Sequence, residues 1–427
     1  MALEVETINF TSPASPGNQT ISLVDTGLTG KAAIAFSCRD TGTSSAGNSK
    51  QMLGITDGTT DRVIGLNAQH SQSTSNTQKR QAAALITTLF DAGSLIEQAT
   101  HVSFAAGSVT IKWSNVHAGA FNYGLIVLGG DDLTDVDCRE HSFPGSTGVP
   151  ATFATGFDCT DDDVAVILIA TLDSTALDNT ADDAVFSVGM FTGSSGAVGN
   201  EMTATTDDQD AVGTTNSAKY QRSNVVFAVL DGSGAIAQEC TVDSLQTDGF
   251  DLNFSTSGTT EKFFALTLKG PQSAVINDTC PGTSTPGTKA NTDPGFTPKQ
   301  GLFFSVSETA NASVDTGMNM CVGGDDDTIN LCSWCGSLDA QSVSDTRRHY
   351  ATTKSIRMKS DVSALQAEGS VDSWDANGLT IDWTADHSTA LEWIGLVMGD
   401  AAAGAAANPK GVFGHPFHGP FGGPLNA

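Results

Sequence analysis

Residues 371–400, VDSWDANGLTIDWTADHSTALEWIGLVMGD, indicate two β-strands joined by a polar loop. Leu379, Ile381 and Trp383 alternate with polar residues, which is the period-two pattern of a half-buried strand. An Asn-Gly pair just before them provides the positive φ that a tight turn requires. A second apolar run, residues 393–398, then follows the loop. The stretch therefore predicts paired antiparallel strands.

The chain contains this stretch three times. Residues 102–130 (VSFAAGSVTIKWSNVHAGAFNYGLIVLGG) and 242–270 (VDSLQTDGFDLNFSTSGTTEKFFALTLKG) repeat its pattern, with an aromatic residue at the same place in each copy. We expect these aromatic side chains to be core anchors of the repeats rather than a platform for sugars. The expected anchors are Trp113, Phe254, Trp383 and Trp393.

The repetition extends upstream of these strands. Lys79, Tyr220 and His349 each lie 34 positions before the equivalent aromatics, in NTQKRQ, NSAKYQR and DTRRHYA. Each copy also begins with a glycine turn and a strand: TGLTGKAAIAFS, TGFDCTDDDVAVILIATL and PGFTPKQGLFFSV. A period of about 130 residues is the size of a domain and too long for a solenoid repeat.

Composition agrees with three β-domains. The chain has 427 residues and 45 glycines, and its apolar runs are short and separated by Thr, Ser, Asp and Ala. The segment KRQAAALITT, residues 79–88, is rich enough in alanine for a helix, but its counterparts SNVVFAVL and KSIRMKS favour strands. The prediction is an all-β fold of three tandem antiparallel β-sandwich domains with short linkers. Three such domains would imitate a trimer or form a rod.

We place the domain boundaries by the repeats and by Pro- and Gly-rich segments. The expected order is repeat one with its N-terminal lead-in at 1–135, a linker at 136–150, repeat two at 151–270, a linker at 271–294, repeat three at 295–400 and a low-complexity tail at 401–427.

The tail has phenylalanines at every fourth position, Phe413, Phe417 and Phe421, among Gly, Pro and His. We expect it to be a docking arm whose phenylalanines enter grooves of a partner. A disordered end is the alternative, and metal binding by His415 and His418 has little support.

Charge limits the partners. The net charge is −28, so the surface repels phosphate backbones, and we expect no nucleic-acid partner. An acidic, soluble surface is the simplest interpretation. Three Asp clusters, at 161–163, 207–210 and 325–327, leave structural Ca²⁺ open, although none matches an EF-hand loop. We predict no cofactor.

The eight cysteines include a C-x-x-C at Cys332 and Cys335, near Cys321. No second pair completes a zinc site, and no βαβ context supports a redox motif. We expect buried thiols, or disulfides formed after release from the cell.

The start, MALEVETINF, lacks the features of a secretory signal, and no apolar run is long enough for a membrane span. Synthesis in a cytoplasm is therefore expected.

Catalytic motifs are hard to find. G-x-S-x-G, H-E-x-x-H and P-loop patterns do not occur, and the histidines do not match between copies. We therefore predict that the chain is not an enzyme. A pair of carboxylates for glycoside hydrolysis stays open, because acidic pairs are abundant.

The repeat, with DGFDLNF or NGLTIDW followed by a strand ending in Gly-Gly or Gly-Asp, resembles tandem-repeat structural proteins of bacteriophage virions. That resemblance implies a virion component, such as a decoration, collar, tail or appendage protein, whose partners are other virion proteins and copies of itself. In the third repeat, NGLTIDW followed by LEWIGLV is similar to the end of the H-type lectin domain, a sugar-binding sandwich. A glycan-binding adhesin is therefore the alternative, and a polysaccharide-degrading enzyme is the third.

Overall fold

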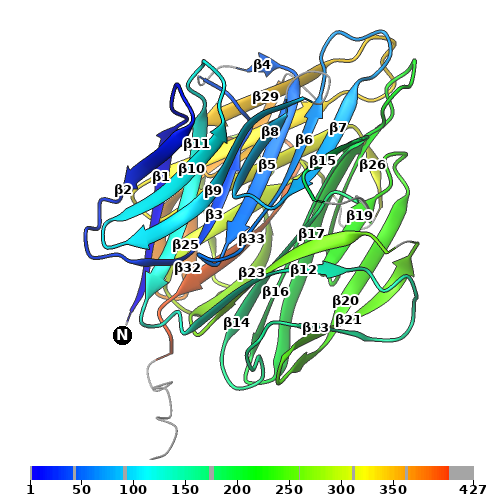
Figure 1. The fold of residues 1–427 in the computed structure, drawn as a ribbon. Helices are drawn as coiled ribbons and strands as arrows, with labels where there is room; N and C mark the ends of the chain where they lie inside the picture. Colours follow the sequence, from blue (N-terminus) through cyan, green and yellow to red (C-terminus); the bar gives the residue numbers. More distant parts are fainter. Residues whose placement is uncertain are drawn as a thin grey trace, which may run out of the picture.

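The computed structural model describes residues 2–41, 45–89, 94–172, 177–258, 260–309, 313–360 and 364–402. All regular structure in these ranges is β, as the sequence predicted, and the strands form three seven-stranded and three four-stranded sheets. Each seven-stranded sheet packs on a four-stranded one, which gives three lobes (Figure 1). No helix in the described ranges is long and apolar enough to cross a membrane.

Lobe one has a wide inner sheet and a narrow outer sheet. The inner order is β1 (Leu3–Thr11), β11 (Asn122–Gly130), β3 (Gly30–Ser37), β5 (Ser49–Thr56), β6 (Asp61–Ala68), β7 (Thr77–Ala82) and β15 (Asn179–Asp182). The outer order is β2 (Gly17–Ser22), β10 (Ser108–Asn115), β9 (Leu95–Ala105) and β8 (Ile86–Leu89). The alanine-rich segment at 79–88 is thus strand β7 running on toward β8, as its counterparts indicated.

Lobes two and three repeat this order. The inner sheet of lobe two is β12 (Asp135–Ser142), β22 (Lys262–Lys269), β14 (Val164–Ala170), β16 (Ala184–Ser194), β17 (Ala197–Asp208), β18 (Ser217–Ser223) and β26 (Asp315–Thr316), and its outer sheet is β13 (Ala151–Ala154), β21 (Gly249–Ser257), β20 (Ile236–Gln246) and β19 (Phe227–Leu230). The inner sheet of lobe three is β23 (Gln272–Thr279), β33 (Glu392–Gly399), β25 (Pro298–Ser305), β27 (Met318–Asp325), β28 (Asn330–Ser337), β29 (Thr346–Ala351) and β4 (Ala46–Gly47), and its outer sheet is β24 (Gly287–Asn291), β32 (Gly378–Ala385), β31 (Ala364–Asp375) and β30 (Ile356–Ser360).

The two segments expected as linkers are not linkers. Residues 136–150 contain most of β12, and residues 271–294 contain β23 and β24. The expectation was wrong because β12 and β23 lie at sheet edges and are mostly half-exposed, so they carry few apolar residues. The joints between lobes are short, at 131–134 and 270–271.

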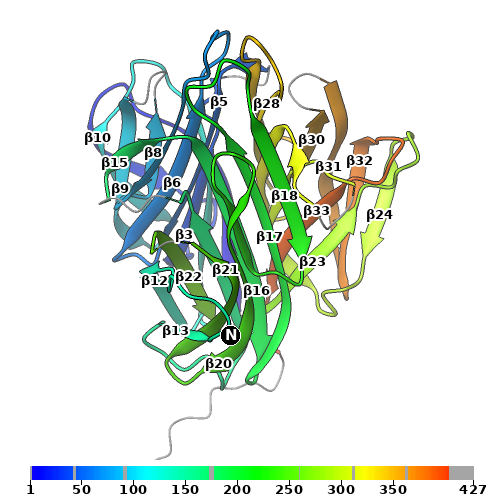
Figure 2. The same ribbon diagram turned by 90° about the vertical axis from the view of Figure 1, so that its right-hand side faces the viewer.

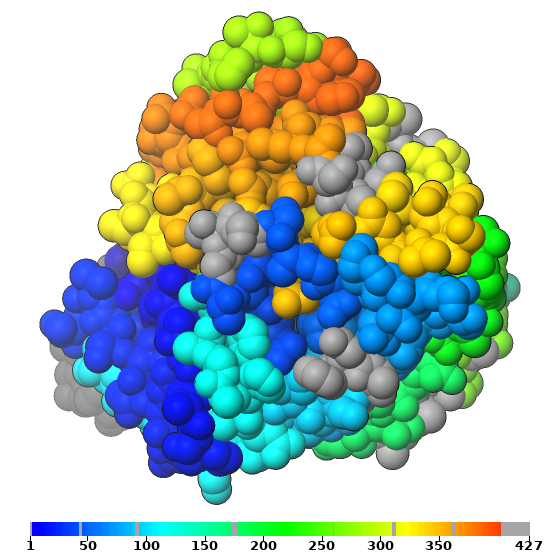
Figure 3. Space-filling model, turned by 90° about the horizontal axis from the view of Figure 1, so that it is seen from above, coloured from blue at the N-terminus to red at the C-terminus, as the bar shows by residue number. Residues whose placement is uncertain are grey.

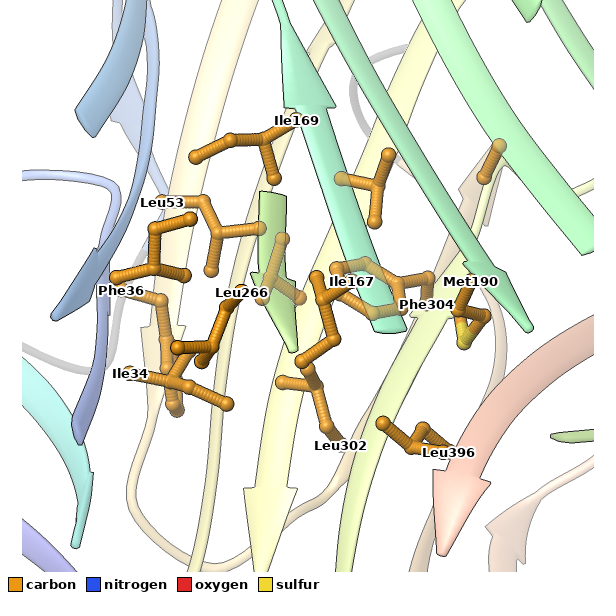
Figure 4. Close-up of a cluster of buried hydrophobic side chains, with 14 of the residues drawn as sticks. Ile34, Phe36, Leu53, Ile167, Ile169, Met190, Leu266, Leu302, Phe304 and Leu396 are labelled. Carbon is orange, nitrogen blue, oxygen red and sulfur yellow. The ribbon is translucent and has the colours of Figure 1, made fainter. Parts of the chain in front are cut away.

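The inner sheets are buried on both faces. One face of each sheet packs on its own outer sheet, and the other packs on a core that all three lobes share. Figure 4 shows side chains of the three lobes converging in this axial core, such as Phe36, Ile167 and Phe304. Burial on both faces explains the continuous apolar run of β14, VAVILIA, whose seven residues are all buried. The lobes therefore surround a common axis and do not form a rod.

The outer sheets are buried on one face only, and β32 shows the predicted alternation of buried and half-buried residues. All four expected core anchors are at most 1% exposed: Trp113, Phe254, Trp383 and Trp393. Each belongs to the core of its own lobe, between inner and outer sheet.

Neighbouring lobes exchange a strand. The last strand of each inner sheet comes from another lobe: β15 of lobe two pairs with β7, β26 of lobe three with β18, and β4 of lobe one with β29. One residue with positive φ, Asn48, Asp183 or Gly317, then turns the chain from the donated strand into the next strand of its own lobe. The exchange covers edges that would otherwise present unpaired backbone groups. It also closes a cycle of three lobes.

Candidate functional site

Three equivalent loops meet where the lobes converge, at the top of Figure 2. They connect β6 to β7, β17 to β18 and β28 to β29, and comprise residues 69–76, 209–216 and 338–345, which we call the apex loops. Their patterns of buried and exposed residues are identical, residue by residue. Each contains one residue with positive φ at the same place, Ser71, Ala211 or Ala340.

One hydroxyl residue in each apex loop joins it to the next lobe. In lobe two, the Thr215 N–H donates to the Gln341 carbonyl (2.9 Å), and its carbonyl accepts from the Ala340 N–H (2.8 Å). The Thr215 hydroxyl donates to the Leu338 carbonyl (2.7 Å) and accepts from the Gln341 N–H (2.8 Å). Every polar group of this buried threonine is thus bonded to lobe three.

Ser75 and Ser344 repeat these contacts. Ser75 makes the same four bonds to residues 209–212 of lobe two, and Ser344 makes them to residues 69–72 of lobe one. The bonds therefore run from lobe one to two, from two to three, and from three back to one. We call this cycle the apex ring. Lobes three and one thus share the same four apex hydrogen bonds as the two pairs of lobes that the chain itself connects.

At the base, the seams between lobes are less alike. The Asp326 carboxylate accepts from the Thr7 N–H (2.6 Å), and Asp57 accepts from the Cys138 N–H at the equivalent place (3.1 Å). At the third seam, the Asn200 amide donates to the Val275 carbonyl instead (3.1 Å). Each contact engages an edge strand, β1, β12 or β23.

Two of the basal seams open into clefts. The cleft between lobes one and three has a volume of about 490 Å³ and is lined by Glu4, Asp25, Lys299, Asp327 and the half-buried Trp374, among others. The cleft between lobes two and three measures about 400 Å³ and includes Asp161–Asp163, Phe296 and Ala402. The chemistry of both linings is mixed polar and acidic, so they are suited to polar ligands or to a partner's basic side chains.

The phenylalanines expected to dock, Phe413, Phe417 and Phe421, lie outside the described residues. The described chain reaches Ala402 at the base, where the Ala401 N–H donates to Asp132 (2.9 Å) and Asp400 accepts from the Leu3 N–H (2.9 Å). The described chain therefore ends at the basal face.

The three Asp clusters have different surroundings. Asp161–Asp163 line a basal cleft, whereas Asp207, Asp208 and Asp325 are buried at strand ends. Burial raises the pKa of Asp207 and that of Asp325 to about 7, and raises the pKa of Asp208 well above its usual range. Asp325 accepts hydrogen bonds from Ser355 and from the Val371 N–H (3.2 Å). Its carboxylate therefore has a structural role. Within the described ranges, no group of three or more His, Cys, Asp or Glu side chains is placed to hold a metal ion.

All eight cysteines are buried free thiols. Cys332 and Cys335 lie three apart on β28, so their side chains point to opposite faces of the sheet. Cys335 belongs to the axial core, and Cys332 packs with Cys321 and Trp334. Burial raises the pKa of Cys321 and of Cys335, which keeps these thiols protonated and unreactive.

Sequence reasoning did not single out Ser75, Thr215 and Ser344. The available signal was a hydroxyl residue, then Asn or Asp, then a second hydroxyl residue, which recurs at residues 75–77, 215–217 and 344–346.

Comparison with protein families finds no match, and comparison with curated proteins finds none either.

Proposed function

We propose that this chain is a non-enzymatic structural component of a bacteriophage particle, acting through protein–protein contacts with other virion proteins. The observation that carries the proposal is the closed cycle of exchanged strands and apex hydrogen bonds. A single chain thereby becomes a rigid body with three similar lobes around one axis. Such a body suits a position where three equivalent neighbours meet, because closed symmetric assemblies offer the same contact three times.

The resemblance of the repeats to virion structural proteins supports the same role. The acidic surface, with a net charge of −28, favours solubility and repulsion between copies away from their docking site. On this proposal the tail after Ala402 is the docking arm, and its three phenylalanines are the contacts that a partner would bury.

The test is the composition and shape of particles from the phage that encodes the chain. Mass spectrometry of purified particles should detect it, and electron microscopy should show a three-lobed density that disappears when its gene is deleted. Absence of the chain from purified particles would refute the proposal.

A truncation after Ala402 tests the arm. We expect the three lobes to fold as before, because the bonds of Leu3, Asp400 and Ala401 are kept, while incorporation into particles is lost. The matched control replaces Phe413, Phe417 and Phe421 with serine and keeps the length. Equal incorporation of all forms would move docking to the lobes.

A glycan-binding adhesin is the second candidate, and Trp374 in the 490 Å³ cleft favours it, because an indole face stacks on sugars. Its equivalents by strand register are Phe104 and Leu245, so the aromatic surface does not recur in all lobes. A glycan array with the intact chain, compared with Trp374→Ala, separates this candidate from the first. Release of sugar from a polysaccharide would instead indicate the enzyme.

A further inference from the structure

The seam between lobes three and one differs from the other two in how it is held. Residues 131–134 join lobes one and two, and residues 270–271 join lobes two and three, but no joint connects lobe three to lobe one. The long contact between these lobes is the border between blue and yellow-to-orange surfaces in Figure 3. This seam therefore depends on noncovalent contacts along its whole length.

Each apex loop has a side chain that accepts a hydrogen bond from a backbone N–H of another lobe. We call each place where two lobes meet in the apex ring a corner. Asp210 accepts from Thr77 (2.7 Å), and Asp339 accepts from Ser217 (3.0 Å). At the third corner the acceptor is an imidazole: His70 Nδ1 accepts from the Thr346 N–H (3.2 Å). Two corners therefore use a carboxylate and the third uses a histidine.

The surroundings of His70 include one cation and one carboxylate. Arg347, on β29, places Nη1 3.1 Å from His70 Nε2, and Asp345, in the apex loop of lobe three, places Oδ1 3.3 Å from Nδ1. On the side of lobe one, Asn48 accepts from the His70 N–H (2.6 Å). A Cβ added at the uncharged Gly47 of β4 would lie 3.5 Å from Cδ2 of the imidazole. Asp345 also contacts Arg347 (3.3 Å), so its charge is shared.

Two donors face the imidazole of His70, the Thr346 N–H and Arg347 Nη1. A neutral imidazole has one nitrogen that can accept, so it satisfies one of them. A protonated imidazole has none, and it adds a positive charge beside Arg347. Only Asp345 opposes this repulsion.

We propose that the seam between lobes three and one is a pH-sensitive latch, in which neutral His70 holds the apex loops together and protonated His70 weakens them. The inference is independent of the proposed function. Asp210 and Asp339 accept their bonds as carboxylates, so the other two corners stay closed when only the imidazole is protonated.

The direction follows from the charge state. Burial and then the Arg347 guanidinium lower the pKa of His70 from 6.5, against a smaller opposite effect of Asp345. The unfolded chain takes up the proton first as pH falls, so the contribution of His70 to stability is full above 6.5 and is lost progressively below that value.

The test is hydrogen exchange of the intact chain at about pH 7.5 and about pH 5. The three amides Thr77, Ser217 and Thr346 are internal references for one another, because they occupy equivalent corners. We expect the protection factor of Thr346 to fall roughly fivefold relative to the other two on acidification. Equal changes at all three amides would overturn the proposal.

Two variants make the test specific. His70→Asn keeps an acceptor at the place of Nδ1 but does not titrate, so Thr346 should stay protected at both pH values. Asp339→His should transfer the pH dependence to Ser217. If that variant does not fold, the pair His70→Asp with Asp345→Asn copies the other corners, where Asn76 and Asn216 stand at the equivalent position. Persistence of the Thr346 effect in His70→Asn would also overturn the latch.

Discussion

The apex and the base of the three seams are built on different principles. At the apex, Ser75, Thr215 and Ser344 make the same four hydrogen bonds, largely with backbone groups. At the base, two seams use an aspartate and the third uses an asparagine with reversed donor and acceptor. Backbone geometry preserves symmetry when side chains differ, whereas contacts between side chains must be matched one seam at a time.

The axial core connects apex and base, so its disruption should have the largest effect. Phe304→Ala removes a fully buried ring that packs among side chains of all three lobes (Figure 4). We expect a loss of about 3–5 kcal/mol in the free energy of unfolding, measured by denaturant titration. Because the core is shared, the variant should still unfold in one transition. Separate transitions for separate lobes would contradict the role of this core.

Breaking one corner of the apex ring should have a smaller effect. Thr215→Val keeps the shape of the side chain but removes the hydroxyl that donates to Leu338 and accepts from Gln341, leaving both backbone groups unsatisfied. The expected cost is about 1–3 kcal/mol. Ser75→Ala and Ser344→Ala are the matched variants, and chemical denaturation should give similar losses for all three. Widely different losses would mean that the ring is symmetric in geometry only.

The repeats were predictable because their anchors are large apolar side chains at fixed spacing. Trp113, Phe254 and Trp383 indicated the lobes, and the alternation before them indicated β32 and its equivalents. The closed ring was not predictable, since serine and threonine are common in turns and nothing in their spacing shows which carbonyl they reach. The exchanged strand β4 is two residues long, and β26 is too, which is below what any periodic pattern can reveal.

The choice between trimer-like and rod-like arrangements needed information on the second face of the inner sheets. In β14 every residue is buried, yet an apolar run of this length is equally consistent with burial inside one lobe. Likewise, the edge strand β12 resembled a linker because its only fully buried residue is Cys138. The sequence therefore did not predict the sheet edges and the seams between lobes, because burial there depends on another lobe.

The basal seams offer the smallest effect and the sharpest contrast with the apex. Asp57 and Asp326 each cap their own hairpin turn with Oδ1, through the N–H groups of Thr59 and Thr328, and reach the neighbouring lobe with Oδ2. Asp57→Ala should therefore cost about 1–2 kcal/mol in the free energy of unfolding, because it removes two kinds of bond to a charged acceptor.

Asn200→Ala, at the third seam, removes one neutral hydrogen bond to Val275 and should cost about 0.5–1 kcal/mol. Thermal and denaturant unfolding of the two variants under the same buffer conditions would show the difference. An equal loss of stability in the two variants would imply that the bond of Asp57 to its own turn contributes nothing. Only the single hydrogen bond between lobes would then matter at each of these seams. A larger loss for Asn200→Ala than for Asp57→Ala would reverse the order argued from the charges.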